Sequence, residues 1–219
     1  MTVLSVFGGQ VKPGRFDDVV EMGRAGAKIQ ERHGAKHPRL MTVSFASSDT
    51  FGSVTLISEF DGLKAFGTHF DKIMADEEIV RLMGELRGAN SPFLSPQSFQ
   101  LNEISLGSGS DDARGKVVSV SRFHLERGRL KQAVEEATAM RDYYVAHGAL
   151  NHRMWVYYAA GPLTGAVMES TEYDSMEAYG ATSESILSDR EGWHLLKRAM
   201  SANSPLTMLG SVVYTQIPL

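Results

Sequence analysis

The sequence repeats itself at a spacing of 114 residues, and this internal duplication constrains the fold more than any other feature. Beyond the first predicted hairpin the spacing becomes 113, as a single deletion would produce. The matching segments keep their order; the clearest are Val3-Leu4-Ser5-Val6 with Val117-Val118-Ser119-Val120, His33-Gly34-Ala35 with His147-Gly148-Ala149, and Ala89-Asn90-Ser91-Pro92 with Ala202-Asn203-Ser204-Pro205. Ordered matches with one gap at a turn indicate two copies of one structural unit.

Each copy has the same predicted secondary structure. A strand is followed by a helix that ends at His-Gly, by two strands joined at a turn, by further helix and by a last strand. The predicted ranges are strand 2–11, helix 15–33 and strands 39–47, 52–60 and 96–104 in the first copy, and strand 116–125, helix 129–147 and strands 153–160, 165–173 and 208–217 in the second. The order β-α-β-β-α-β is that of a ferredoxin-like unit.

The duplication predicts an α+β protein with two ferredoxin-like domains, residues 1–105 and 116–219, and a linker at 106–115 that contains a Gly- and Ser-rich run. A sheet with helices on one face leaves its other face open. Two such sheets in one chain can bury their open faces against each other, as an intrachain pseudo-dimeric α/β barrel.

In this repeat layout the sequence resembles the dimeric α/β-barrel superfamily in a tandem-fused form. That superfamily includes antibiotic-biosynthesis-monooxygenase-like, NIPSNAP-like and chlorite-dismutase-like proteins. The resemblance covers almost the whole chain and rests on topology, without a catalytic motif, so it implies fold more than activity. It implies a cavity between sheet and helices in which polar groups hold and deprotonate a substrate.

Composition restricts the function. Net charge is −4, so the sequence lacks the excess of basic residues by which proteins bind nucleic acid. The sequence contains no cysteine, which rules out disulfides and thiolate sites. The sequence shows no apolar stretch long enough to cross a bilayer, and its start does not have the pattern of a signal peptide. We therefore expect a cytoplasmic protein without a membrane partner. Scattered histidines without carboxylates at ligand spacing predict no metal, and we expect no cofactor.

The two copies differ in their aromatic residues. All 7 tyrosines and both tryptophans lie in the second copy, whereas most phenylalanines lie in the first. A buried phenol needs a hydrogen-bonding partner, so a tyrosine-rich interior usually offers its hydroxyls to something. The first copy therefore reads as a scaffold and the second as the site.

The candidate site is built from two strands. Arg153, Trp155 and Tyr157 alternate onto one face of their strand, and Arg122 and His124 share one face of theirs. We expect them to line one pocket, with His124 as base and Arg122 or Arg153 as anion clamp. The predicted substrate-binding residues are Trp155, Tyr157, Tyr173, Tyr179, Trp193 and His194.

This pocket suits a small aromatic or polyketide-like molecule that carries an oxygen anion. The favoured function is an enzyme of the cofactor-independent monooxygenase-like type that uses base-assisted chemistry, either an oxidoreductase or a lyase or isomerase. The alternatives are a non-catalytic ligand-binding protein, a haem-binding protein of the chlorite-dismutase-like type with His194 as candidate ligand, and a structural barrel that forms a homodimer.

Two repeated pairs have simpler explanations than catalysis. His33 and His147 sit where a helix dipole favours a cation, although a base or ligand role stays open. Arg39 and Arg153 lie nearly opposite Glu59 and Glu172 in the predicted hairpins, which favours cross-strand ion pairs over anion binding.

Overall fold

The computed structural model describes residues 1–46, 50–107 and 113–219. Its elements divide into two compact units. Unit 1 comprises Met1–Asn102, Tyr158–Gly161 and Thr215–Leu219, and unit 2 comprises Glu103–Tyr157 and Pro162–Tyr214. The predicted turn at Ser48-Asp49 includes residues outside the described ranges, as do residues 108–112 of the predicted linker.

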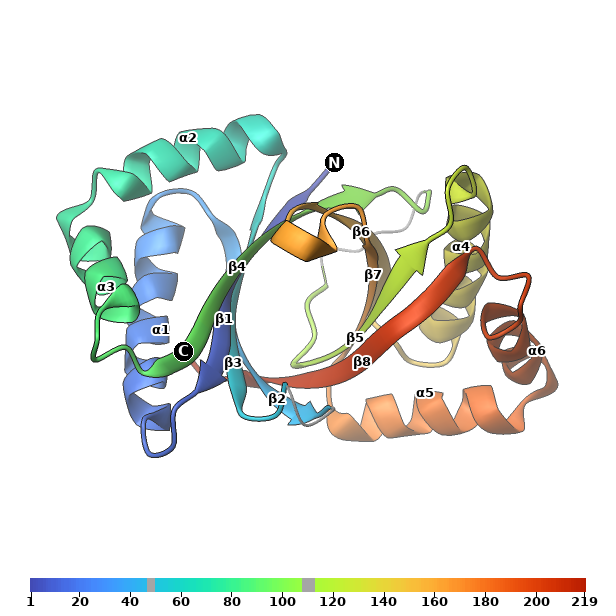
Figure 1. Cartoon of the computed structure of the whole chain (residues 1–219). Coiled ribbons are helices and arrows are strands. Elements are labelled where there is room, and N and C mark those ends of the chain that lie inside the picture. The colour runs from blue at the N-terminus through green and yellow to red at the C-terminus, as the bar shows by residue number, and fades with distance from the viewer. Residues whose placement is uncertain (47–49, 108–112) are drawn as a thin grey trace. The chain divides into compact units, whose positions relative to one another are not determined.

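The first copy folds as a four-stranded antiparallel sheet with helices on one face (Figure 1). Its elements are β1 (Val3–Val11), α1 (Phe16–Arg32), β2 (Lys36–Phe45), β3 (Ser53–Phe60), α2 (Leu63–Met74), α3 (Glu77–Arg87) and β4 (Phe93–Ile104). The strand order is β4-β1-β3-β2. In the core of this copy, Val19, Val20 and Ala27 of α1 pack against Leu40 and Val54 of the sheet. The burial of these apolar side chains holds α1 on the sheet.

The second copy repeats this arrangement. Its elements are β5 (Val117–Leu125), α4 (Leu130–Ala146), β6 (Asn151–Ala159), the short 3₁₀ helix Gly161–Leu163, β7 (Val167–Tyr173), α5 (Met176–Ser188), α6 (Arg190–Ala199) and β8 (Leu206–Ile217). The strand order is β8-β5-β7-β6, the same topology as in the first copy. The predicted α+β class with two tandem ferredoxin-like units is confirmed.

The repeated His-Gly pairs end the first helix of each copy, as predicted. His33 and His147 are the C-cap residues of α1 and α4. Gly34 and Gly148 follow with φ of 93° and 103°, a left-handed conformation that a side chain would disfavour. The two histidines are fixed by local contacts: His33 Nε2 lies 2.7 Å from Asp76 Oδ2, and His147 Nδ1 lies 2.8 Å from the Tyr143 carbonyl oxygen.

The predicted Arg–Glu pairs differ between the copies. Arg39 Nη2 lies 4.0 Å from Glu59 Oε1, although the register places Arg39 opposite Ile57 and makes the contact diagonal. Arg153 stands opposite Ser170, and its Nε donates to Glu103 Oε1 at 2.8 Å. In each hairpin the predicted glutamate lies two positions along its strand from the residue that faces the arginine, so the arginine and the glutamate are not directly opposite.

Hydrogen bonds fix the described ends of the predicted linker. Arg141 Nη1 donates to the Leu106 carbonyl at 2.5 Å, and Asn151 Nδ2 donates to the Ala113 carbonyl at 2.6 Å. The backbone N–H of Gly115 donates to Glu172 Oε2 at 2.7 Å. The chain on either side of residues 108–112 is therefore held by unit 2. Within the described ranges, every helix is too short or too polar to span a bilayer.

Candidate functional site

Strand alternation divides the second copy's sheet into two chemically different faces. Phe123, Met154 and Val167 pack against Ala133 and Ala137 of α4, so their side chains point to the helix-covered face. Neighbouring residues on a strand point the opposite way. The predicted pocket residues on β5 and β6, namely Arg122, His124, Arg153, Trp155 and Tyr157, therefore lie on the face that points away from α4.

On that face the register sets the predicted residues in rows. Arg122 pairs with Met168 of β7, and Met168 pairs with Trp155 of β6. One step further along, the Tyr157 N–H donates to the Ala166 carbonyl at 3.0 Å. The structure thus brings Arg122, Trp155 and Tyr157 onto one surface of one sheet, as the sequence predicted.

Trp155 is the fixed centre of this surface. It is 2% exposed, and its indole Nε1 donates to Ser170 Oγ at 2.9 Å. The Arg153 guanidinium lies over the indole ring, 4.2 Å from its centroid. This cation–π contact and the bond to Glu103 are contacts that Arg153 makes on this surface.

Tyr157 and Arg122 are electrostatically coupled. Burial raises the pKa of the Tyr157 phenol to about 12, while the positive charge of Arg122 acts to lower it. The Tyr157 hydroxyl contacts Met168 Sδ at 3.6 Å, a weak acceptor. Arg122 itself is half-buried.

His124, the predicted base, is exposed at the end of β5. The alternation places it on the same face as Arg122, but water reaches the imidazole. A base in a reaction that excludes water needs a desolvated position, which this exposed imidazole does not have.

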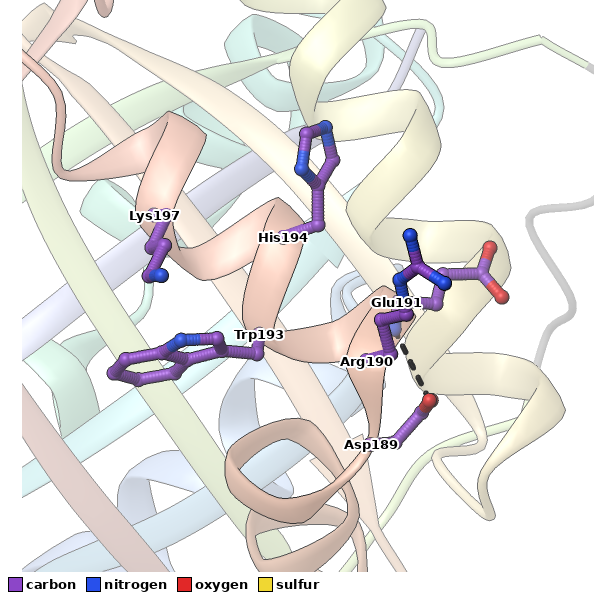
Figure 2. A pocket seen from close by; sticks show the side chains of 6 residues that line it. All are labelled: Asp189, Arg190, Glu191, Trp193, His194 and Lys197. Atoms are coloured by element: carbon purple, nitrogen blue, oxygen red, sulfur yellow. Dashed lines mark hydrogen bonds between the residues drawn. The ribbon is translucent and has the colours of Figure 1, made fainter.

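Trp193 and His194 do not join this surface, which corrects the expectation of one shared pocket. Both are exposed on α6, which packs on α4 and α5, whereas Trp155 points away from α4. Figure 2 shows them at an open surface hollow of about 560 Å³. The hollow is lined by Asp189, Arg190, Glu191, Trp193, His194 and Lys197. The Lys197 ammonium lies 5.2 Å from the centroid of the Trp193 ring.

The surroundings of His194 do not fit haem. A haem pocket needs apolar walls around the macrocycle, and this hollow is open and lined mainly by charged side chains. A metal site has no better support: in the ranges 1–46, 50–107 and 113–219, no three His, Asp or Glu side chains are placed to hold an ion.

Tyr173 and Tyr179 lie in a different layer from Trp155 and Tyr157. Tyr173 packs with Val117 and Ala149, and its ring meets that of Tyr179 edge-on at 5.5 Å. Because Tyr173 is an even number of positions from Val167, it points to the helix-covered face. The residues of the predicted single pocket therefore lie in three separate places: the face that points away from α4, the helix-covered face with Tyr173 and Tyr179, and the hollow on α6.

The helix-covered face holds a buried polar cluster that the sequence analysis missed. His152 of β6 is 4% exposed, and its Nδ1 lies 2.8 Å from Thr171 Oγ1. Its Nε2 lies 3.6 Å from Glu169 Oε2. The Tyr144 ring, from α4, is tilted against the imidazole with centroids 5.3 Å apart. We call His152, Glu169, Thr171 and Tyr144 the inner polar cluster.

Burial disfavours the charged form of both titratable partners of the inner polar cluster. Burial lowers the pKa of His152 to about 3, and the nearby charge of Arg141 acts in the same direction. Burial raises the pKa of Glu169 to about 7, with a smaller contribution from the negative charge of Glu136. Two neutral groups do not form an ion pair, so below pH 7 the 3.6 Å contact joins a carboxylic acid and an uncharged imidazole.

The first copy has a cavity where the second has this cluster. Residues aligned with Tyr144 and Glu169 are Gln30 and Leu56, and both line a cavity of about 70 Å³. Gly23 and Gly26 of α1 also line it, beside the apolar side chains of Leu40, Val54 and Phe93. No acid, base or nucleophile is among its lining residues, so the cavity alone offers no chemistry.

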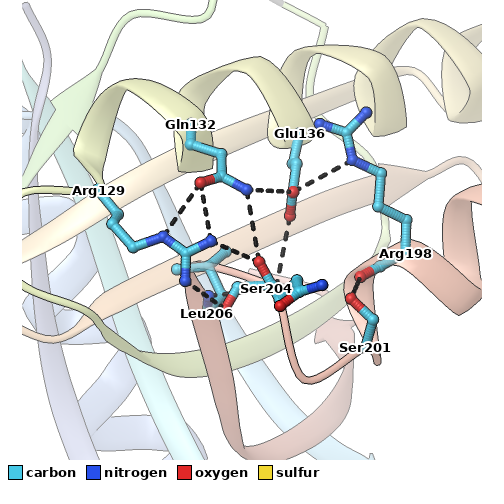
Figure 3. Close-up of polar contacts among 8 residues, drawn as sticks. Arg129, Gln132, Glu136, Arg198, Ser201, Ser204 and Leu206 are labelled. Carbon is cyan, nitrogen blue, oxygen red and sulfur yellow. Dashed lines mark hydrogen bonds and ion pairs between the residues drawn. The ribbon is translucent and has the colours of Figure 1, made fainter.

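A polar network joins the start of α4 to α6 and to the loop before β8 (Figure 3). Arg198 Nε donates to Glu136 Oε1 at 3.2 Å, and Ser204 Oγ contacts Glu136 Oε2 at 3.4 Å. Arg129 donates to Gln132 Oε1 and to backbone carbonyls of the loop before β8. These contacts hold the first two turns of α4 against α6 and the segment that follows it.

Comparison with solved structures identifies the fold. A protein from Lactobacillus acidophilus, provisionally described as a monooxygenase, superposes with a TM-score of 0.62 at 8% identity over 99% of this chain and 93% of its own. An anthrone oxidase-like protein gives 0.57 at 16% identity, covering 99% and 91%. A monooxygenase-like protein from Listeria innocua gives 0.51 at 11% identity, covering 100% and 95%.

At these identities the likeness defines the fold. The chain has the ferredoxin-like, dimeric α/β-barrel type of fold that these monooxygenase-like proteins share, in tandem form, and the resemblance drawn from the repeat layout is confirmed. No known protein family matches the sequence, and no curated protein does.

Proposed function

We propose that this protein is a small-molecule enzyme of the cofactor-independent monooxygenase-like type, acting on an aromatic or polyketide-like compound by base-assisted oxidation. The observation that carries the proposal is the carboxyl of Glu169. It lies under α4, its side chain is 13% exposed, and its pKa of about 7 lets it take up and release a proton near neutral pH.

The buried position favours Glu169 over His124 as the base. A carboxylate that is little hydrated takes a carbon-bound proton more readily than a solvated one, and a catalytic pKa near the working pH is the most efficient. In the tautomer in which His152 Nδ1 donates to Thr171, its Nε2 lone pair faces the Glu169 carboxyl across 3.6 Å, a contact longer than a hydrogen bond. We assign His152 the role of a positioning residue that borders the carboxyl.

The solved anthrone oxidase-like protein points to a probe substrate. An anthrone has a methylene group between two aromatic rings, so removal of one proton gives a delocalised carbanion. Transfer of an electron to dioxygen and formation of a C–O bond give a hydroperoxide, and loss of water leaves the quinone. The balance is anthrone plus O₂ to anthraquinone plus H₂O, with Glu169 holding the first proton until the peroxide anion takes it up to become the hydroperoxide.

Oxygen uptake with anthrone tests the proposal. We expect the wild-type protein to consume oxygen and form anthraquinone faster than buffer does. Glu169→Gln should lower the rate at least tenfold, within the range that general bases contribute. Glu184→Gln, an exposed carboxylate of α5, is the matched control and should leave the rate unchanged.

The same assay can exclude this mechanism. Full activity of Glu169→Gln would remove the base assignment, whereas loss of activity in His124→Ala with retention in Glu169→Gln would return the role to His124. Saturable binding of anthrone without oxygen uptake under any condition would instead establish a non-catalytic ligand-binding protein.

A further inference from the structure

Helix α2 of the first copy presents an apolar stripe to solvent. Leu63, Phe70 and Met74 are 39%, 52% and 49% exposed, and Gly67 between them is exposed as well. Their spacing of four, three and four residues places all of them on one side of the helix. We call Leu63, Gly67, Phe70 and Met74 the α2 seam. The seam continues outward from the core, because the Phe70 ring lies 6.2 Å from that of Phe66, which packs on the core under α2.

The duplication indicates that the fold does not require this apolar stripe. The residue aligned with Phe70 in α5 of the second copy is Ser183. The Ser183 hydroxyl donates to the Tyr179 carbonyl at 2.7 Å, so a polar residue is accepted at this position. The first copy instead exposes a phenyl ring to water, which is unfavourable unless another surface covers it.

The α2 seam is complementary to itself when two copies of α2 lie antiparallel. Phe70 of one chain then faces Gly67 of the partner subunit, and Leu63 faces Met74 of the partner subunit, because both pairs are centred on the same level of the helix. Among the described residues, a Cβ atom on Gly67 would meet nothing within 4 Å, so space for the phenyl ring is open in the single chain. A large side chain set into the gap left by a small one is how helices pack closely.

The charges beside the α2 seam favour the antiparallel pairing. Lys64 and Asp71 are both exposed and are seven residues apart, so they lie on the same flank of α2. Antiparallel pairing brings Lys64 within two positions, about 3 Å along the axis, of the level of Asp71 of the partner subunit. A parallel pair would set like charges against each other. The aligned positions of α5 are Glu177 and Glu184, so two copies of α5 would repel in either direction.

We infer that two copies of this chain associate through the α2 seam as a symmetric antiparallel dimer. The occupant is a second copy because the seam itself supplies both the ring and the gap, and both signs of charge, that complete it. The seam lies on a helix of 12 residues, so the dimer is weak and dissociates on dilution. It is independent of the proposed oxidation, because α2 belongs to unit 1 and Glu169 to unit 2.

Sedimentation equilibrium over a series of protein concentrations tests the dimer. We expect the average mass to rise from 24.0 kDa in dilute protein toward twice that value. Phe70→Ser, which introduces the residue of the second copy, should weaken association at least tenfold. Gly67→Gln, which fills the gap but has open space around it in the single chain, should weaken it as well. Val80→Ser removes an exposed apolar side chain of α3 and is the matched control, which should associate like the wild type.

Charge reversal tests the antiparallel register. Lys64→Asp sets two carboxylates together at each flank and should weaken the dimer severalfold, whereas combining it with Asp71→Lys should recover the wild-type association. Phe70→Ser should keep the oxygen uptake of the wild type, so failure of the dimer and failure of the proposed oxidation are distinguishable. A mass of 24.0 kDa at every concentration, full association of Phe70→Ser, or no recovery by the double reversal would each overturn the inference.

Discussion

His33 Nε2 lies 2.7 Å from Asp76 Oδ2, which joins the C-cap of α1 to the N-cap of α3. In the second copy an aspartate again stands at the helix N-cap and a histidine at the helix C-cap, but the aspartate has a different hydrogen-bonding partner. Asp189, the N-cap of α6, accepts from the Tyr143 hydroxyl at 2.9 Å, and His147 instead stacks on the Tyr143 ring at 4.0 Å. Duplication has thus preserved the joint between the two helices while its hydrogen bond was replaced.

This joint predicts an acid-sensitive first copy. The bond from His33 and the ion pair with Arg32 hold the pKa of Asp76 at about 2, below the ordinary value near 4. A lowered carboxyl pKa contributes stability that is present above pH 4 and is lost as the pH falls toward 2. We expect Asp76→Asn to lower the melting temperature at pH 7 and to flatten its decline between pH 4 and 2. Asp71→Asn, an exposed acid of α2, should do neither.

The second copy's joint depends on a glycine. A Cβ atom on Gly192 would lie 2.6 Å from the Tyr143 hydroxyl oxygen and 2.6 Å from the Ile186 Cα. We expect Gly192→Ala to destabilise the protein by about 1–3 kcal/mol through overpacking. Gly180→Ala on α5, where a Cβ would meet nothing within 4 Å, should instead stabilise it by roughly 0.4–1 kcal/mol. Urea unfolding measures both, and a neutral Gly192→Ala would contradict the close approach.

Much of the fold could be predicted because the sequence carries each signal twice. The His-Gly pairs ended both α1 and α4, and the strand ranges agreed with the structure to within a few residues. The sequence pattern does not specify which face of each strand the helices cover. Period-two alternation placed Trp155 and Tyr157 together, but only the packing of Met154 on α4 shows that they face away from the helix.

The same missing orientation explains why the inner polar cluster was overlooked. His152 is flanked by Arg153 on β6, and a lone histidine on an apolar strand is an ordinary core residue. Its partner Glu169 is seventeen residues away in the sequence and meets it only through the pairing of β6 with β7. The sequence does carry one signal for the cluster. Glu169 and Thr171 are two and four positions after Val167 on β7, so strand alternation places all three side chains on the same face.

The open hollow around His194 predicts that haem does not bind there. We expect a haem titration to give only the broad absorbance of free haem, because charged and exposed side chains cannot enclose the macrocycle. A sharp Soret band that disappears in His194→Ala would contradict this. His124→Ala, which removes another exposed histidine, is the matched control for weak surface ligation.

The hydrogen bond between Trp155 and Ser170 should stabilise the second sheet measurably. Ser170→Ala leaves the buried indole N–H without its acceptor, and we expect a loss of roughly 1–3 kcal/mol. In Trp155→Phe the N–H is absent, so adding Ser170→Ala to that variant should cost less. A double-mutant cycle by urea unfolding gives the coupling energy, and a value of zero would show that the bond contributes nothing.

Glu169 should make the stability of the protein depend on pH in the direction opposite to Asp76. Its folded-state pKa of about 7 lies above its ordinary value of 4.5, so the folded state binds this proton more tightly than the unfolded state does. The stability that this proton contributes is complete below pH 4.5 and is lost as the pH rises through 7, with a total of ~3 kcal/mol. Glu169→Gln cannot ionise, so its stability relative to the wild type should increase between pH 5 and pH 8, whereas Glu184→Gln should show no such change.

Because ionisation of Glu169 also creates the proposed base, the rate of oxygen uptake by the wild type should rise over the pH interval in which its stability falls. If the two curves shared no inflection near pH 7, the buried carboxyl would not be the group that links them.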